Sequence, residues 1–175
     1  MVGARSETPA VVPSEADPRG LRRPTFAFLA VALQAAPGLP GGHLVALRHW
    51  LVVASGLLLV AWFLVNVRAA VGALRVALGV ALVGAAMNLA VMVPNGGMPV
   101  SPAALDAIGA GSVDVADGNL YKHRLLDDGT VLAALGDVIP VRPLGMAASA
   151  GDVVLLVGIL GVVGVLLGSR RSARP

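Results

Sequence analysis

Two long runs without a charged residue, Trp50 to Val67 and Val76 to Val93, constrain this chain more than any other feature. A helix needs about 20 apolar residues, at about 1.5 Å each, to cross the roughly 30 Å of hydrocarbon in a bilayer. Both runs reach that length with slight help from their flanks. They predict two transmembrane helices, so lipid is the main solvent of this protein.

The composition of the whole chain supports the same interpretation. Hydrophobic residues make up 57% and charged residues only 13%, whereas soluble domains carry about 25% charged residues. Aromatic residues are 3%, which favours packed helices over the aromatic-girdled strands of a membrane barrel. We therefore predict an all-α polytopic membrane protein. The absence of cysteine excludes disulfides, thiolate metal sites and cysteine nucleophiles.

Two further apolar segments lie near the ends of the chain. The later one, Val153 to Leu167, reaches spanning length if it begins near Met146 and Asp152 lies at the membrane rim, where a charge costs less than at mid-bilayer. The earlier one is shorter and contains a proline. Together they predict about four transmembrane helices within a membrane domain of residues 21–168, at about 24–39, 48–67, 73–93 and 147–168.

The distribution of charge predicts the orientation, because cytoplasmic flanks collect Lys and Arg. If the basic tail at 169–175 is cytoplasmic, nine of the 13 Lys and Arg residues lie inside and the other four outside. This arrangement predicts a multi-pass plasma-membrane protein with both termini cytoplasmic and residues 94–151 outside. Residues 1–20 predict a disordered cytoplasmic tail. Alternatively, Arg22 to about Ala36 is a cleaved signal peptide, which leaves the remaining topology unchanged.

Small residues predict how the helices pack, since close approach of backbones drives association in lipid. Ala77, Ala81 and Ala85 repeat every four residues, and Gly164 with Gly168 forms a GxxxG pattern in the last segment. Each set predicts a helix interface within the bundle or a dimer face; alternatively, such spacings arise by chance in a chain so rich in Ala and Gly.

The amides in or beside the spans predict hydrogen bonds between helices. No Asp, Glu, Lys or His lies deep within a span, which argues against a proton-coupled transporter or ion pump. The amides are Gln34, Asn66 and Asn88.

Seven of the ten acidic residues lie between Asp106 and Asp152, in the outer segment (residues 94–151) or directly after it. After an Asn-Gly-Gly turn, Ser101 is a suitable N-cap for a short surface helix that ends at about Ile108. The apolar stretch Thr130 to Leu135 is too short to span and predicts a second surface helix, closed by Gly136 and followed by an extended stretch.

Three motifs in this region carry a resemblance to a known family. They are Asn95 to Val100 (NGGMPV), Thr130 to Pro140 with its LGDVIP sequence, and Gly151-Asp152 before the last helix. On these motifs the chain resembles, over roughly Leu21 to Leu167, a group of small bacterial integral membrane proteins, mostly Gram-positive, known as a domain of unknown function. That family usually begins with one further apolar helix, where this chain has a polar tail. The resemblance implies a shared architecture but no activity.

Four polar residues are candidates for a site in the outer segment: Asn95, His123, Asp137 and Asp152. Two carboxylates, an imidazole and an amide would suit a divalent cation or shared acid and base roles. The structural alternative is that Asp152 caps the last helix and Asp137 stabilises the turn after Gly136. We assign no catalytic residue, and the metal and cofactor are unknown, because the sequence has no hydrolase, zincin, phosphate-loop or dinucleotide motif.

These observations support three hypotheses about function. The first is a non-enzymatic structural or assembly protein of the cell envelope, whose partners are the lipid bilayer and another membrane protein or a second copy. The second is a small membrane enzyme or metal-dependent factor that uses the outer polar residues. The third is a transporter or channel with a polar path past Asn88 and Gln34. Nucleic acid is not an expected partner, because the arginines are scattered.

Overall fold

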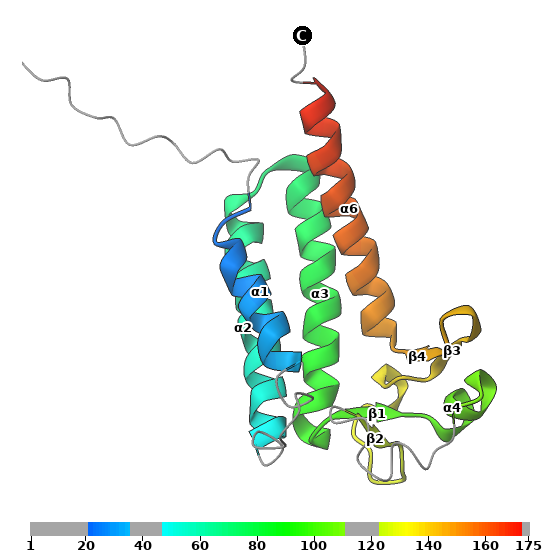
Figure 1. Cartoon of the computed structure of the whole chain (residues 1–175). Helices are drawn as coiled ribbons and strands as arrows, with labels where there is room; N and C mark the ends of the chain where they lie inside the picture. Colours follow the sequence, from blue (N-terminus) through cyan, green and yellow to red (C-terminus); the bar gives the residue numbers. More distant parts are fainter. Residues whose placement is uncertain (1–20, 36–46, 111–122, 173–175) are drawn as a thin grey trace, which may run out of the picture.

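Three long helices form the body of the protein in a computed structural model that describes residues 21–35, 47–110 and 123–172 (Figure 1). They are α2 (Arg48–Ala69), α3 (Gly72–Asn95) and α6 (Ala150–Ser172). Each is long and apolar enough to cross a membrane. The predicted helical membrane architecture is confirmed to this extent. The predicted tail at 1–20 lies outside the described residues, and α6 continues into the stretch predicted to be a basic tail.

The first helix, α1 (Pro24–Ala35), is shorter than a membrane span. Its 12 residues extend about 18 Å at 1.5 Å per residue, against roughly 30 Å of hydrocarbon. It packs along α2 (Figure 1). A fourth span over 24–39 therefore remains a prediction, and residues 36–39 lie outside the described ranges.

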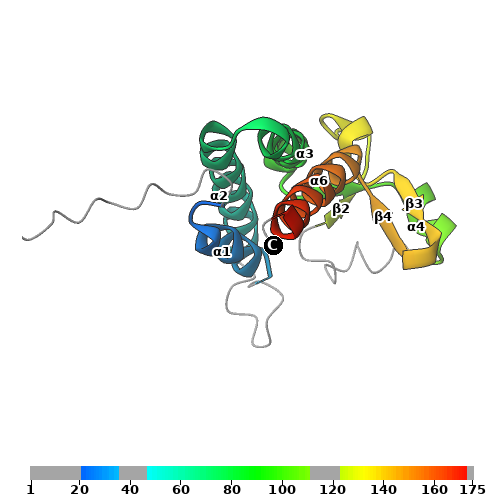
Figure 2. The same cartoon turned by 90° about the horizontal axis from the view of Figure 1, so that it is seen from above.

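Helix α3 is the centre of the bundle (Figure 2). It packs against α6 on one side and α2 on another, and α1 covers α2. Within the described residues, α2 and α6 make no comparable contact with each other. The largest buried cluster follows α3 and includes Leu74, Leu78 and Ala81, with Phe63 from α2 and Val162 from α6.

The α3–α6 contact is close because small residues face each other. A Cβ at Gly84 would overlap the backbone of Leu155, and a Cβ at Gly158 would overlap that of Ala81. The predicted small-residue face of the third span is therefore correct at Ala77 and Ala81. The Gly164 and Gly168 pair does not form this contact: a Cβ at either glycine would meet no described atom within 4 Å.

The connecting segment, residues 96–149, joins α3 to α6, and its described parts, 96–110 and 123–149, lie at one end of the bundle (Figure 1). Strands β1 and β2 pair in parallel, and β3 and β4 pair antiparallel. Its elements are β1 (Met98–Val100), α4 (Pro102–Ile108), β2 (His123–Leu125), η3 (Ala133–Leu135), β3 (Ile139–Val141), η4 (Arg142–Leu144) and β4 (Met146–Ala148).

The structure corrects part of the prediction for this segment. The first surface helix is present as α4, and the Ser101 hydroxyl caps it by accepting from Ala104 N. The second helix is wrong: only the 3-10 turn η3 forms, because Leu132 has a left-handed backbone conformation (φ 55°) that interrupts a right-handed helix. The four short strands were not predicted, so the all-α class holds for the bundle and not for the connecting segment.

Candidate functional site

The beginning of α6 is joined to α3 through its cap. Ser149, which precedes α6, accepts a hydrogen bond from Asp152 N at 2.9 Å, and Asp152 Oδ2 accepts one from Ser149 N at 3.1 Å. This reciprocal pair is a capping box. Asn88 of α3 donates to Asp152 Oδ1 at 2.6 Å and accepts from the Ser149 hydroxyl at 2.9 Å. The predicted capping role of Asp152 and interhelical role of Asn88 are both confirmed.

A second polar contact joins strand β2 to Asp137, which forms an isolated bridge with Val100 of β1. His123 in β2 has its Nε2 atom 3.3 Å from Oδ2 of the buried Asp137. The backbone of Asp137 is fixed to β1, since its N–H donates to Pro99 O at 2.8 Å and its carbonyl accepts from Ser101 N at 3.1 Å. The sequence suggested a turn-stabilising role for Asp137, and the contact with His123 adds a cross-strand role.

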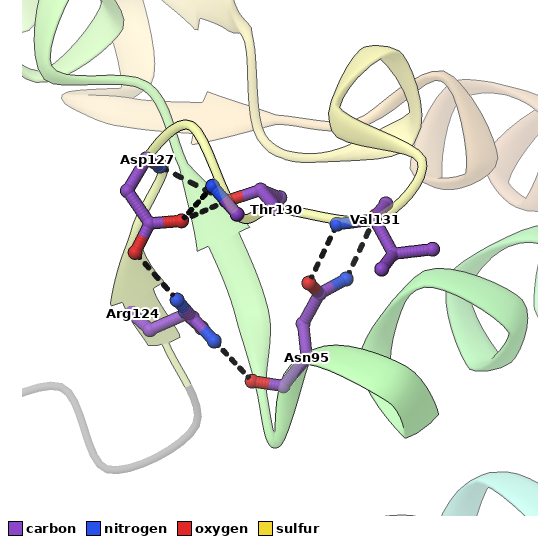
Figure 3. Close-up of polar contacts among 6 residues, drawn as sticks. Asn95, Arg124, Asp127, Thr130 and Val131 are labelled. Atoms are coloured by element: carbon purple, nitrogen blue, oxygen red, sulfur yellow. Dashed lines mark hydrogen bonds and ion pairs between the residues drawn. The ribbon is translucent and has the colours of Figure 1, made fainter.

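Asn95, at the end of α3, holds the connecting segment by its amide (Figure 3). Its Oδ1 accepts from Val131 N at 2.9 Å, while its Nδ2 donates to Val131 O at 2.8 Å and to Val91 O at 2.6 Å. The side chain is buried. Asn95 therefore binds both backbone groups of one residue, much as a paired strand would.

The carbonyl of Asn95 continues this hydrogen-bond network (Figure 3). It accepts from Arg124 Nη1 at 3.0 Å, and Arg124 Nη2 lies 2.7 Å from Asp127 Oδ2. The Thr130 hydroxyl, which donates to Asp127 Oδ1 at 2.9 Å, is the main cause that lowers the pKa of Asp127. The guanidinium of Arg124 acts in the same direction. The network fixes the turn that follows His123.

A cavity of about 230 Å³, here called the interhelical cavity, lies between α2, α3, α6 and the connecting segment. It exists because α2 and α6 both pack on α3 without comparable contact with each other. Its apolar wall includes Val52, Leu89 and Met92. Its polar lining includes Asn88, His123, Asp137 and Asp152.

The interhelical cavity brings together three of the four residues proposed from the sequence. His123, Asp137 and Asp152 line it, whereas Asn95 supports the connecting segment and is not part of the lining. Asn88 joins them; the sequence suggested for Asn88 an interhelical hydrogen bond or a place on a polar path, and not a place in this cluster. The Ser-x-x-Asp pattern from Ser149 to Asp152 was the signal that could have placed Asn88 in this cluster. The pattern predicts a helix cap, and the side chains of Ser149 and Asp152 still need a hydrogen-bond partner from a neighbouring helix.

The donor set of the cavity does not suit a metal. Within the described ranges, no group of three or more His, Cys, Asp or Glu side chains could hold a metal ion. One polar atom does lack a partner: His123 Nδ1 is buried and has no hydrogen bond within the described part of the chain. The site therefore offers hydrogen bonds and an apolar wall, which are the usual features of a small-molecule pocket.

Comparison with known proteins gives one match. A family of unknown function, DUF5317, matches residues 20–164. No curated protein and no solved structure matches the chain.

Proposed function

The chain belongs to DUF5317, a family of unknown function, and on that premise we propose that it is a membrane protein that binds a small amphiphilic molecule in the interhelical cavity. One observation carries this proposal: the lining of the cavity combines apolar side chains of α2 and α3 with four polar side chains from α3, α6 and the connecting segment. An amphiphile also has an apolar and a polar part.

We also propose that the protein is a cell-membrane protein with cytoplasmic termini and an external connecting segment. Arg68 and Arg75 support this orientation, because they flank the short turn between α2 and α3 at the other end of the bundle. Basic residues collect on the cytoplasmic side. In this orientation the part of the cavity lined by the connecting segment faces the outer side, where an amphiphile can enter from the outer leaflet.

The bound molecule must match both parts of the cavity. About 230 Å³ is below the 300–1,000 Å³ usual for drug-sized ligands, so the ligand is small or only partly enclosed. Its head group hydrogen-bonds to His123 Nδ1, the buried atom that lacks a described partner. Its apolar part contacts Leu89 and Met92 of α3.

Replacing Ala85 with leucine is expected to reduce the bound small molecule by at least about tenfold, because Ala85 is buried and lines the cavity. The measurement is native mass spectrometry of protein purified from its own membranes, followed by extraction of the retained molecule. Ala86→Leu is the matched control, since the neighbouring Ala86 is exposed. Equal retention in all three proteins, or no retained molecule in any, would overturn the proposal.

Replacing His123 with phenylalanine keeps a ring in the cavity but removes both nitrogen atoms. We expect about fivefold weaker retention of the same molecule, because a typical net hydrogen bond contributes about 1 kcal/mol. His49→Phe is the control, since His49 is not part of the lining. Unchanged retention in His123→Phe, with an unchanged melting temperature, would exclude a polar head at this position.

The other hypotheses gain less support. A structural or assembly role remains a prediction. The metal-dependent alternative lacks a suitable ligand group within the described residues. A transport path would have to pass the α3–α6 contact, which is filled by small apolar residues such as Ala77, Ala81 and Gly158, and the side chain of Gln34 is outside the described part of the structure.

A further inference from the structure

A second cavity is lined by residues at the start of α1 and in the later half of α2. These two helices lie side by side in Figure 1. The second cavity measures about 190 Å³ and is separate from the interhelical cavity. Two arginines, Arg22 and Arg23, stand beside apolar side chains in its lining. The apolar residues include Phe26, Leu58, Ala61 and Val65.

The two arginines are held in place by their backbone. The buried Asn66 accepts from Arg22 N at 2.7 Å and donates to Arg22 O at 3.2 Å. The indole of Trp62 donates to the carbonyls of Arg22 at 2.9 Å and Arg23 at 3.0 Å. The carbonyl oxygens of both residues are thus used by Trp62, so they do not face an incoming anion as free acceptors.

Among the described residues, no acidic side chain occupies the two guanidinium groups. Both side chains are exposed, and neither forms an ion pair with any carboxylate of the described residues. The guanidinium of Arg23 lies 5.9 Å from the ring centre of Phe26, which keeps it at the cavity. The described acidic residues all lie in the connecting segment or at the adjacent start of α6.

We propose that this cavity binds an anionic phospholipid. Its phosphate lies between Arg22 and Arg23, since guanidinium groups bind phosphate oxygens in a bidentate manner. Its acyl chain lies against Phe26, Leu58 and Ala61. Trp62 lies between these two regions, as interfacial tryptophans do. Basic residues at the cytoplasmic end also face the leaflet that is rich in anionic lipid.

The test uses Trp62 as a reporter in the full-length Trp50→Phe protein, because the chain contains only two tryptophans. The protein is reconstituted in phosphatidylcholine vesicles that contain either dibrominated phosphatidylglycerol or dibrominated phosphatidylcholine at the same fraction. Bromine atoms quench a nearby indole. We expect brominated phosphatidylglycerol to bind near Trp62 at least about tenfold more strongly than brominated phosphatidylcholine.

The arginine variants distinguish a site from general charge attraction. Arg22→Gln with Arg23→Gln is expected to abolish the preference, whereas Arg68→Gln with Arg142→Gln removes the same charge elsewhere and should retain it. Equal quenching by both lipids in the unsubstituted background, or equal loss in both double variants, overturns the proposal.

Two further experiments test whether the acyl chain contributes to binding. Ala61→Phe, which fills the apolar part without a change of charge, should lower the quenching, while the exposed Ala90→Phe should not. Excess inorganic phosphate should not displace the lipid if the acyl chain contributes. Full displacement by phosphate identifies a soluble phosphate site and overturns the lipid assignment. The result is independent of ligand retention in the interhelical cavity.

Discussion

Replacing Gly84 with valine is expected to destabilise the bundle by about 3 kcal/mol and to lower its melting temperature by roughly 6 to 12 °C. A Cβ at this position would overlap the backbone of Leu155 and come within 2.7 Å of Gly151 O. Backbone atoms cannot rotate away as a flexible side chain can, so α3 and α6 must separate. Thermal unfolding in detergent, followed by the fluorescence of the two tryptophans, measures the change.

Gly79→Val is the matched control in the same helix. A Cβ at Gly79 would meet nothing within 4 Å, so this variant makes the same change in helix propensity without a clash. We expect its melting temperature to stay within a few degrees of the parent protein. If the two variants melt alike, the close α3–α6 contact does not determine the stability of the bundle.

Replacing Asn95 with alanine is expected to release the turn around Val131 from the end of α3. The substitution removes three side-chain hydrogen bonds and leaves the N–H and C=O of Val131 without their partner. Loss of these bonds costs about 2 kcal/mol locally. Hydrogen exchange of the Val131 amide should therefore become roughly thirtyfold faster.

Asp128→Ala serves as the control for the Asn95 variant, because Asp128 is exposed and lies in the same turn. It should leave the exchange of the Val131 amide nearly unchanged. Exchange should also stay slow in the middle of α3 in both proteins, since the helix itself is intact. Unchanged exchange at Val131 in Asn95→Ala would show that Asn95 does not hold the connecting segment.

The sequence predicts the bundle well because both the length of an apolar run and the spacing of small residues can be read within a single helix. Length and apolar character define α2, α3 and α6, and small residues such as Ala77 and Ala81 define the contact with α6. The Gly164 and Gly168 pair shows the limit of that rule. Spacing alone does not say which face of α6 meets α3, and Gly158 occupies that contact instead.

The connecting segment was harder to predict because its strands are short and pair over long distances in sequence. β1 has three residues, including a proline, and pairs with β2 across residues 111–122. Periodicity cannot appear in three residues. The sequence identified the polar residues but did not show which of them share a site. In the structure His123 and Asp137 meet at the cavity, while Asn95 supports the connecting segment beside it.

Two asparagines of α3 connect it by hydrogen bonds to two of its neighbours. Asn88 ties it to the start of α6 and Asn95 ties it to the connecting segment. These parts form a fixed frame around three sides of the interhelical cavity. Helix α2 contributes apolar residues there, and a Cβ at Gly56 would come within 2.8 Å of the flexible Leu89 side chain. A larger residue at position 56 would therefore push the flexible side chain of Leu89, which lines the cavity.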